Sequence, residues 1–238
     1  MAAVVIVSGW AMSAEILSPL AEALESSGHH VTSLSLAEAQ GETWDDLYAL
    51  LDTAINGQKT VLVGWSLGGN LCARYAARNP EKVAALVTMG STPSYVTADG
   101  WTGGKHPDAY KEFADGVAAD IQTAMKGFAP VCARGSNDMK GAIRAFRASA
   151  KWALGTDTDW RELLDRLAED ARPLWSQVSC PALHFLADSD PLAKSDIATD
   201  LQALVPQHKV TVLSGSHGIF LDHTEEVVQA VNSFSREA

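Results

Sequence analysis

Residues 64–68 read Gly-Trp-Ser-Leu-Gly, which has the residue types and spacing of an activated serine nucleophile. A Gly-x-Ser-x-Gly pattern places the serine on a sharp turn between a strand and a helix, and the glycines leave room for neighbouring backbone. Here an apolar segment, 60–63, precedes the pattern and a helix-length segment, 67–78, follows it. We therefore predict that Ser66 is a nucleophile rather than a serine that caps a tight turn.

A serine hydroxyl attacks only when a neighbouring base removes its proton, and an acid orients that base. His217 follows the last predicted strand, at the edge of the sheet where the base is needed, and His223 is the alternative. Two carboxylates, Asp188 and Asp190, follow the penultimate strand. We predict Asp190 as the acid, because it lies within a turn closed by Pro191, and Asp188 as a solvated loop residue.

Two backbone amides are expected to hold the negative oxygen that forms during acyl transfer. Leu67 begins the helix after the nucleophile, so its N–H points out of the helix end. The second donor should come from the loop after the first strand, where residues 8–12 read Ser-Gly-Trp-Ala-Met. We predict the Trp10 amide as this donor, with an ordinary strand-end turn as the alternative.

The rest of the chain alternates strand-like and helix-like segments. Short apolar runs predict strands at 3–7, 31–36, 60–63, 83–89, 182–186 and 209–213. Helical patterns lie between them, at 14–25, 44–55, 67–78, 193–204 and 224–236. Such alternation is typical of an α/β fold with a mostly parallel, doubly wound sheet, here of about six strands.

One long segment interrupts this alternation. Between residues 91 and 179 no strand is convincing, and helical patterns cover 107–128, 138–154 and 158–168. We therefore predict a core made of residues 1–90 and 180–238, with residues 91–179 inserted as an all-helical cap over the site.

Composition excludes several classes of partner. The chain has 238 residues, enough for one α/β domain, and a net charge of −11 disfavours nucleic acid and anionic membranes. No apolar run approaches the roughly 20 residues of a membrane span, and no basic leader precedes the first strand. Cys72, Cys132 and Cys180 are too scattered for a disulfide framework or a metal site. We expect a cytoplasmic monomer that needs no metal and no organic cofactor.

These residues resemble the α/β-hydrolase superfamily and, more narrowly, the pimeloyl-[acyl-carrier protein] methyl ester esterases of biotin synthesis (the BioH type). The marks are Gly-Trp-Ser-Leu-Gly-Gly at 64–69, Gly-Trp at 9–10, Asn-Pro-Glu-Lys-Val at 79–83 and Ser-His-Gly-Ile-Phe at 216–220. The chain departs from the family at Ser8, where relatives carry a histidine, and after the second strand, where it reads Leu-Ala-Glu-Ala-Gln-Gly.

The resemblance implies an α/β-hydrolase fold and a serine carboxylesterase that works through an acyl-enzyme. Its triad would be Ser66, Asp190 and His217. By the same resemblance, Trp10 and Leu67 would line the acyl pocket as well as supply backbone donors, and Phe128 would close it. The alternatives are a general short-chain carboxylesterase, or a C–C hydrolase, lyase or thioesterase on the same fold.

A basic stripe marks the predicted cap. Lys140, Arg144, Arg147 and Lys151 have helical spacing and share one helical face. In an acidic protein such a face could dock an acidic partner, and by resemblance this partner would be acyl-carrier protein. A solvated cationic face is the alternative. The expected substrate is therefore a small ester or one linked to the carrier protein.

Overall fold

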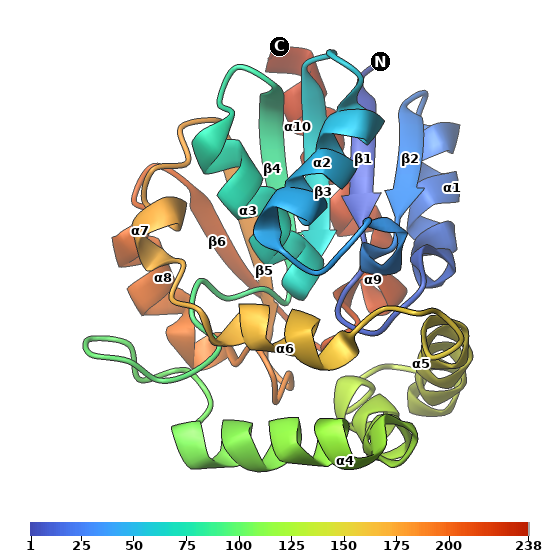
Figure 1. Ribbon diagram of the computed structural model, residues 1–238. Helices are drawn as coiled ribbons and strands as arrows, with labels where there is room; N and C mark the ends of the chain where they lie inside the picture. The colour runs from blue at the N-terminus through green and yellow to red at the C-terminus, as the bar shows by residue number, and fades with distance from the viewer. Residues whose placement is uncertain (238) are drawn as a thin grey trace.

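The computed structural model describes residues 1–237 and is built around a sheet of six strands (Figure 1). The strands lie in the order β2-β1-β3-β4-β5-β6, and every neighbouring pair is parallel. Their bounds are β1 (Ala3–Val7), β2 (His30–Leu34), β3 (Thr60–Trp65), β4 (Val83–Met89), β5 (Ala182–Ala187) and β6 (Lys209–Leu213). The predicted parallel, doubly wound sheet of about six strands is confirmed.

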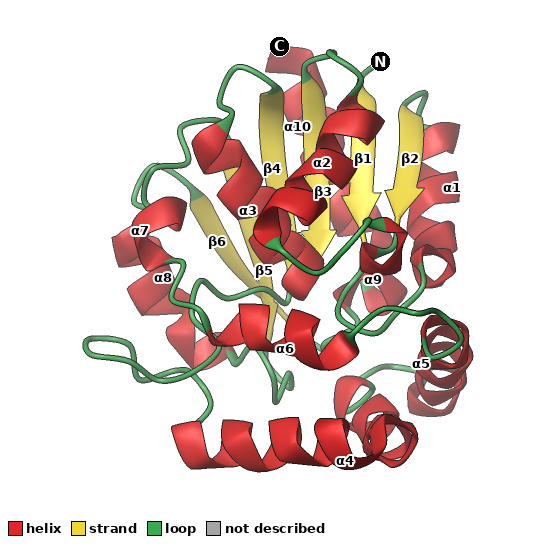
Figure 2. Cartoon of the chain, in the orientation of Figure 1, coloured by secondary structure: helices red, strands yellow, loops and turns green. Residues whose placement is uncertain are grey.

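Helices cover both faces of the sheet, as Figure 2 shows. The helices α1 (Ser18–Ser26) and α10 (Thr224–Glu237) pack together on one face, while α2 (Trp44–Ile55) and α3 (Leu67–Arg78) pack together on the other. A further helix, α8 (Ala198–Leu204), packs against the edge strand β6. Because the central strands are covered on both sides, their residues are apolar almost throughout, and all of β3 is buried.

The predicted second strand ends too late in the sequence. Strand β2 stops at Leu34, because Ser35 caps the short 3₁₀ helix η2 (Leu36–Glu38). The Ser35 hydroxyl accepts from the Ala37 N–H, and the Ser35 N–H donates to the Glu38 carboxylate at 2.7 Å. Two predicted helices likewise contain 3₁₀ turns, η1 (Ala14–Leu17) before α1 and η3 (Ser195–Ile197) before α8.

Four helices connect β4 to β5. They are α4 (Pro107–Cys132), α5 (Met139–Ala153), α6 (Trp160–Ala168) and α7 (Arg172–Trp175). Figure 1 places α4, α5 and α6 beyond the carboxyl ends of the strands, whereas α7 lies beside α3. No named strand occurs between residues 90 and 181, although isolated bridges join Val96 to Lys105 and Ala98 to Trp101.

Helix α4 consists of two helical arms. At Asp120 the backbone is non-helical, with φ −159° and ψ 91°. The Asp120 carboxylate accepts from the Thr123 N–H at 3.1 Å and from the Thr123 hydroxyl at 2.6 Å, so it caps the second arm. None of the helices in residues 1–237 combines the length and the apolar character needed to cross a membrane.

Candidate active site

Ser66 occupies the turn between β3 and α3 in a strained backbone conformation. Its φ is 55° and its ψ is −121°, a region that non-glycine residues rarely adopt. Such strain costs on the order of 1–3 kcal/mol and persists only where the surroundings hold it. Here the Ser66 N–H donates to the Met89 carbonyl at 2.9 Å, and the Ser66 carbonyl accepts from the Ser91 hydroxyl at 2.9 Å. Strand β4 and the loop after it therefore fix the turn.

Three glycines let the backbone close around Ser66. A Cβ on Gly64 would lie 2.4 Å from the Gly69 Cα, and one on Gly68 would lie 2.4 Å from the Ser8 carbonyl oxygen. A Cβ on Gly69 would lie 2.0 Å from the Ser91 hydroxyl oxygen. Real Cβ atoms do not come this close to other atoms, so a side chain at any of these positions would push the turn open.

His217 and Asp190 form a buried pair. His217 lies on the loop after β6 and Asp190 on the loop after β5, and the histidine Nδ1 is 2.7 Å from the carboxylate Oδ2. His217 is 2% exposed and Asp190 is 4% exposed. The other carboxylate oxygen accepts from the N–H groups of Leu192, at 2.7 Å, and Ala193, at 3.1 Å. Because a carboxylate only accepts, Nδ1 is assigned as the donor, and Nε2 is left to act as a base.

The two alternatives to this pair lie elsewhere. Asp188 is exposed and accepts from the Gly215 N–H at 3.0 Å and from the Ser189 hydroxyl at 3.0 Å. These bonds, the one from Gly215 first, lower the pKa of the Asp188 carboxyl. Both ring nitrogens of His223 are also occupied, one by the Ser214 carbonyl at 2.6 Å and the other by Glu226 at 2.9 Å. Neither residue contacts His217 or Ser66 through a hydrogen bond.

The two predicted amide donors come from different elements, the start of α3 and the turn after β1. Leu67 is the first residue of α3, where the N–H has no carbonyl partner in a preceding turn. Trp10 lies in the turn after β1, and the next residue, Ala11, has a φ of 54°. The Trp10 ring N–H donates to the Trp160 carbonyl at 2.6 Å, so the side chain is anchored to helix α6.

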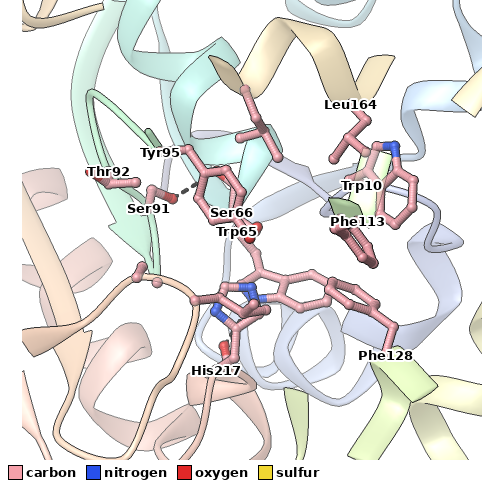
Figure 3. A pocket seen from close by; sticks show the side chains of 14 residues that line it. Trp10, Trp65, Ser66, Ser91, Thr92, Tyr95, Phe113, Phe128, Leu164 and His217 are labelled. Atoms are coloured by element: carbon pink, nitrogen blue, oxygen red, sulfur yellow. Dashed lines mark hydrogen bonds between the residues drawn. The ribbon is translucent and has the colours of Figure 1, made fainter. Parts of the chain in front are cut away.

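Ser66 and His217 open onto a narrow pocket with an apolar wall, seen in Figure 3. Phe128 and Trp10 belong to this wall, whereas the Leu67 side chain is fully buried and is not among the lining residues. The ring centroids of Trp10 and Phe128 are 5.5 Å apart at a right angle.

Other pocket residues were not predicted from the sequence. They are Trp65, Ser91, Thr92, Tyr95, Phe113, Leu164, Leu167, Leu192 and Ala193, together with Gly90. Phe113 stacks on Phe128 with centroids 5.8 Å apart, and Trp65 donates its ring N–H to the His217 carbonyl at 2.9 Å. Trp65 could have been inferred because it precedes the nucleophile. The other lining residues come from loops and helices that are far apart in the sequence, and no local sequence pattern indicates that they pack around one pocket.

A second, wider hollow adjoins the pocket. It has a volume of about 530 Å³ and shares with the narrow pocket the side chains of Tyr95, Phe113, Phe128 and Leu192. The lining residues with polar side-chain groups are Tyr95, Lys105, Glu112 and Thr123. The aromatic residues of α4 thus form a partition between the serine and this outer hollow.

The basic stripe lies on α5. Its four side chains, those of Lys140, Arg144, Arg147 and Lys151, are exposed and form no ion pair with the described side chains of residues 1–235. The opposite face of α5 is buried. Arg147 and Lys151 also border a groove between α4 and α5, where Lys126 adds a further cation.

The three cysteines are free and buried. Burial raises the pKa of the Cys72 and Cys132 thiols, and it raises that of Cys180 to about 11, so these thiols stay protonated near neutral pH. In the part of the chain that the structure describes, no three His, Cys, Asp or Glu side chains are grouped so as to hold a metal ion.

Comparison with known proteins identifies relatives over nearly the whole chain. The family model for the alpha/beta hydrolase fold matches residues 2–224. The pimeloyl-[acyl-carrier protein] methyl ester esterase of Aliivibrio salmonicida is 28% identical, with 97% of this chain and 90% of the relative covered. The biotin biosynthesis bifunctional protein BioHC of Cellvibrio japonicus is 29% identical over 97% of this chain, but the chain spans only 47% of that protein.

Solved structures show the same fold at lower identity. An esterase from Exiguobacterium antarcticum superposes with a TM-score of 0.82 at 17% identity, covering 99% of this chain and 92% of the other. A hydrolase from Oleispira antarctica superposes with a TM-score of 0.83 at 13% identity, covering 100% and 92%.

Proposed function

Since the chain belongs to the α/β-hydrolase fold family, we propose that it is a serine carboxylesterase with Ser66, Asp190 and His217 as its triad. The observation that carries the proposal is the 2.7 Å contact between His217 Nδ1 and Asp190 Oδ2, buried beside a pocket that also contains Ser66. The names of the curated relatives support an ester as the substrate. Ser66 and His217 line the same pocket, which supports a role for the buried His217–Asp190 pair as the base and acid that serve this serine.

In the proposed reaction, His217 Nε2 accepts the proton of the Ser66 hydroxyl while the serine oxygen attacks the ester carbonyl. The amides of Leu67 and Trp10 hold the resulting oxyanion. The tetrahedral intermediate collapses, and the alcohol leaves with the proton from His217. A water molecule, deprotonated by His217, then attacks the acyl-enzyme, and the acid departs as Ser66 regains its proton. Asp190 stays ionised throughout and stabilises the imidazolium that forms twice in each cycle.

The apolar pocket wall favours an acyl chain without charge close to the reacting carbonyl. We propose that the substrate is pimeloyl-[acyl-carrier protein] methyl ester, the ester named for relatives that share 27–28% identity over 97% of this chain. Residues 91–179 would act as the cap, since α4 and α6 supply Phe113, Phe128 and Leu164 to the pocket. The stripe on α5 would dock the acidic carrier protein.

The proposal is tested by measuring acid release from pimeloyl-acyl-carrier-protein methyl ester and from p-nitrophenyl butyrate, with wild type and Ser66→Ala. We expect both substrates to be cleaved, and both activities to disappear in the variant. Cleavage of the p-nitrophenyl ester alone would indicate a general short-chain carboxylesterase. A Ser66→Ala protein with full activity would overturn the serine mechanism itself.

A further inference from the structure

The loop that carries the proposed donor Trp10 is strained. Ala11, the next residue, has a φ of 54°, in the left-handed region that non-glycine residues adopt at a cost. A residue stays in that region only when contacts on either side hold it there. The contacts of residues 8–13 therefore decide where the Trp10 N–H points.

Two of these contacts come from serines that directly follow β1 and β2. The hydroxyls of Ser8 and Ser35 both donate to the Met12 carbonyl, at 2.9 and 3.2 Å. The bond from Ser8 spans four residues and closes the loop on itself. These bonds fix the residue just after Ala11 from one side only.

The opposite side is held by helix α5. The Ser13 N–H donates to the hydroxyl oxygen of Ser149 at 2.8 Å, and the two hydroxyl oxygens are 3.2 Å apart. Ser13 and Ser149 are 2% and 5% exposed, so no bulk water can replace this bond if it is lost. The contact joins residues that are 136 positions apart in the chain.

The same face of α5 reaches the other parts of the site. Phe146 packs on Trp65 with ring centroids 5.8 Å apart. The Phe146 ring also lies against Gly218, where an added Cβ would be 2.8 Å from it. The Ala153 carbonyl accepts from the ring N–H of Trp160, whose own carbonyl accepts from Trp10. Residues 146, 149 and 153 recur at helical spacing, so one helix face contacts the neighbours of nucleophile, base and donor.

We propose that Ser149 is a positioning residue of the reaction: its hydroxyl holds Ser13, and through the strained loop it keeps the Trp10 amide aimed at the oxyanion. Ser149 itself touches neither substrate nor reacting atoms. The inference rests on the proposed function, because it presupposes that the oxyanion forms between Trp10 and Leu67.

The expected effect follows from where the oxyanion exists. Removal of a whole oxyanion donor lowers kcat by about 10²–10³. A donor that is displaced rather than removed should lose less, so we expect Ser149→Ala to lower kcat about tenfold. The ground-state ester carries no oxyanion, and KM should therefore change by less than about twofold.

The test compares Ser149→Ala with wild type in the hydrolysis of p-nitrophenyl butyrate and in inhibition by an alkyl trifluoromethyl ketone. This inhibitor forms a tetrahedral serine adduct whose oxyanion needs the same donors. Its affinity should fall by a factor similar to that of kcat. Thr60→Val is the matched control, because Thr60 is also a buried residue with a hydroxyl bond, to the Gln58 carbonyl at 3.0 Å, but lies at the amino end of β3.

A purely structural role would lower the stability of both variants and leave kcat and inhibitor affinity intact. That result in Ser149→Ala, with Ser66→Ala inactive, would overturn this inference and leave the proposed function standing. Ser66→Ala retaining activity would instead overturn the proposed function. Where Ser149→Ala does not fold, the nearly isosteric Ser149→Cys is used instead. It should lose kcat and inhibitor affinity by less than the tenfold expected for Ser149→Ala but measurably, and wild-type values would overturn the inference.

Discussion

The turn around Ser66 and the helix α4 are built in opposite ways. At the turn, a Cβ on Gly64 would meet the Gly69 backbone at 2.4 Å, whereas Gly116 on α4 has nothing within 4 Å of an added Cβ. The turn is held by close backbone packing and by its bonds to Met89 and Ser91, while α4 breaks at Asp120 and offers aromatic side chains from both arms. The reacting atoms are thus fixed by backbone, and the pocket wall is assembled from side chains.

The largest effect is expected from the proposed acid, Asp190, which the N–H groups of Leu192 and Ala193 hold on the loop after β5. Asp190→Asn should lower kcat by about 10⁴, because the imidazole loses the partner that sets its tautomer and stabilises its charge. Asp188→Asn is the control, since Asp188 is exposed and its carboxylate accepts from Gly215 and Ser189 rather than from His217. Equal losses in steady-state kcat for both variants would contradict the assignment of Asp190.

Glycine replacements test the comparison directly. Gly64→Ala should lower the free energy of unfolding by about 3 kcal/mol or more, because backbone atoms must move to admit the methyl group. Gly116→Ala should raise it by up to about 1 kcal/mol, since alanine is the better helix former and the site is open. Urea unfolding of both variants measures this. A Gly64→Ala protein with the unfolding free energy of wild type would contradict the close packing of Gly64 against Gly69.

Mildly acidic pH should destabilise the protein through a buried histidine in the sheet rather than through the helices α4–α6. Burial, and secondarily the charge of His208, lower the pKa of His184 on β5 to about 3. Thr88 and His208 occupy its two ring nitrogens at 2.9 and 3.1 Å. In the helical segment 91–179 the histidine, His106, is exposed.

Stability falls in acid because the unfolded chain takes up a proton that the folded protein does not. Below pH 6.5 the unfolded chain protonates His184 and the folded one does not, so stability is complete above pH 6.5 and falls as the pH drops toward 3. From this group we expect a loss of about 2 kcal/mol at pH 5 relative to pH 7. Urea unfolding at the two pH values measures it. The difference in unfolding free energy between the two pH values should be smaller in His184→Gln, and an unchanged difference would assign the effect to other groups.

The smallest effect concerns the outer face of α5. Arg144→Glu with Arg147→Glu should lower kcat/KM for the carrier-linked ester by about 5- to 30-fold, because two favourable charges become repulsive. The p-nitrophenyl ester should be cleaved as before. Lys59→Glu, a reversal of an exposed cation at the start of β3, should leave both substrates unaffected. Equal loss with both esters would point to a damaged site, and no loss to a solvated stripe.

The sequence was informative where function depends on local backbone. Ser66, Asp190 and His217 were predicted because each follows a recognisable strand, and the structure brings the last two within 2.7 Å. Leu67 was expected in the pocket from the family resemblance, but the start of α3 turns its side chain into the core. Phe113, Tyr95 and Leu164 were not predicted, because their roles arise from how α4, α6 and the loop after β4 approach one another in space.

The order of the strands also has a consequence for how the chain folds. Strands β1 to β4 pair among themselves within residues 3–89, but β5 must reach β4 across the intervening residues 90–181. Closing a loop of that length is entropically unfavourable, and it makes parallel pairing slow. During synthesis β4 would wait as an exposed apolar edge until β5 emerges, and such an edge is prone to aggregation. The segment that carries the proposed acid and base thus also completes the sheet, so we expect a chain that ends before it to lack activity and to aggregate.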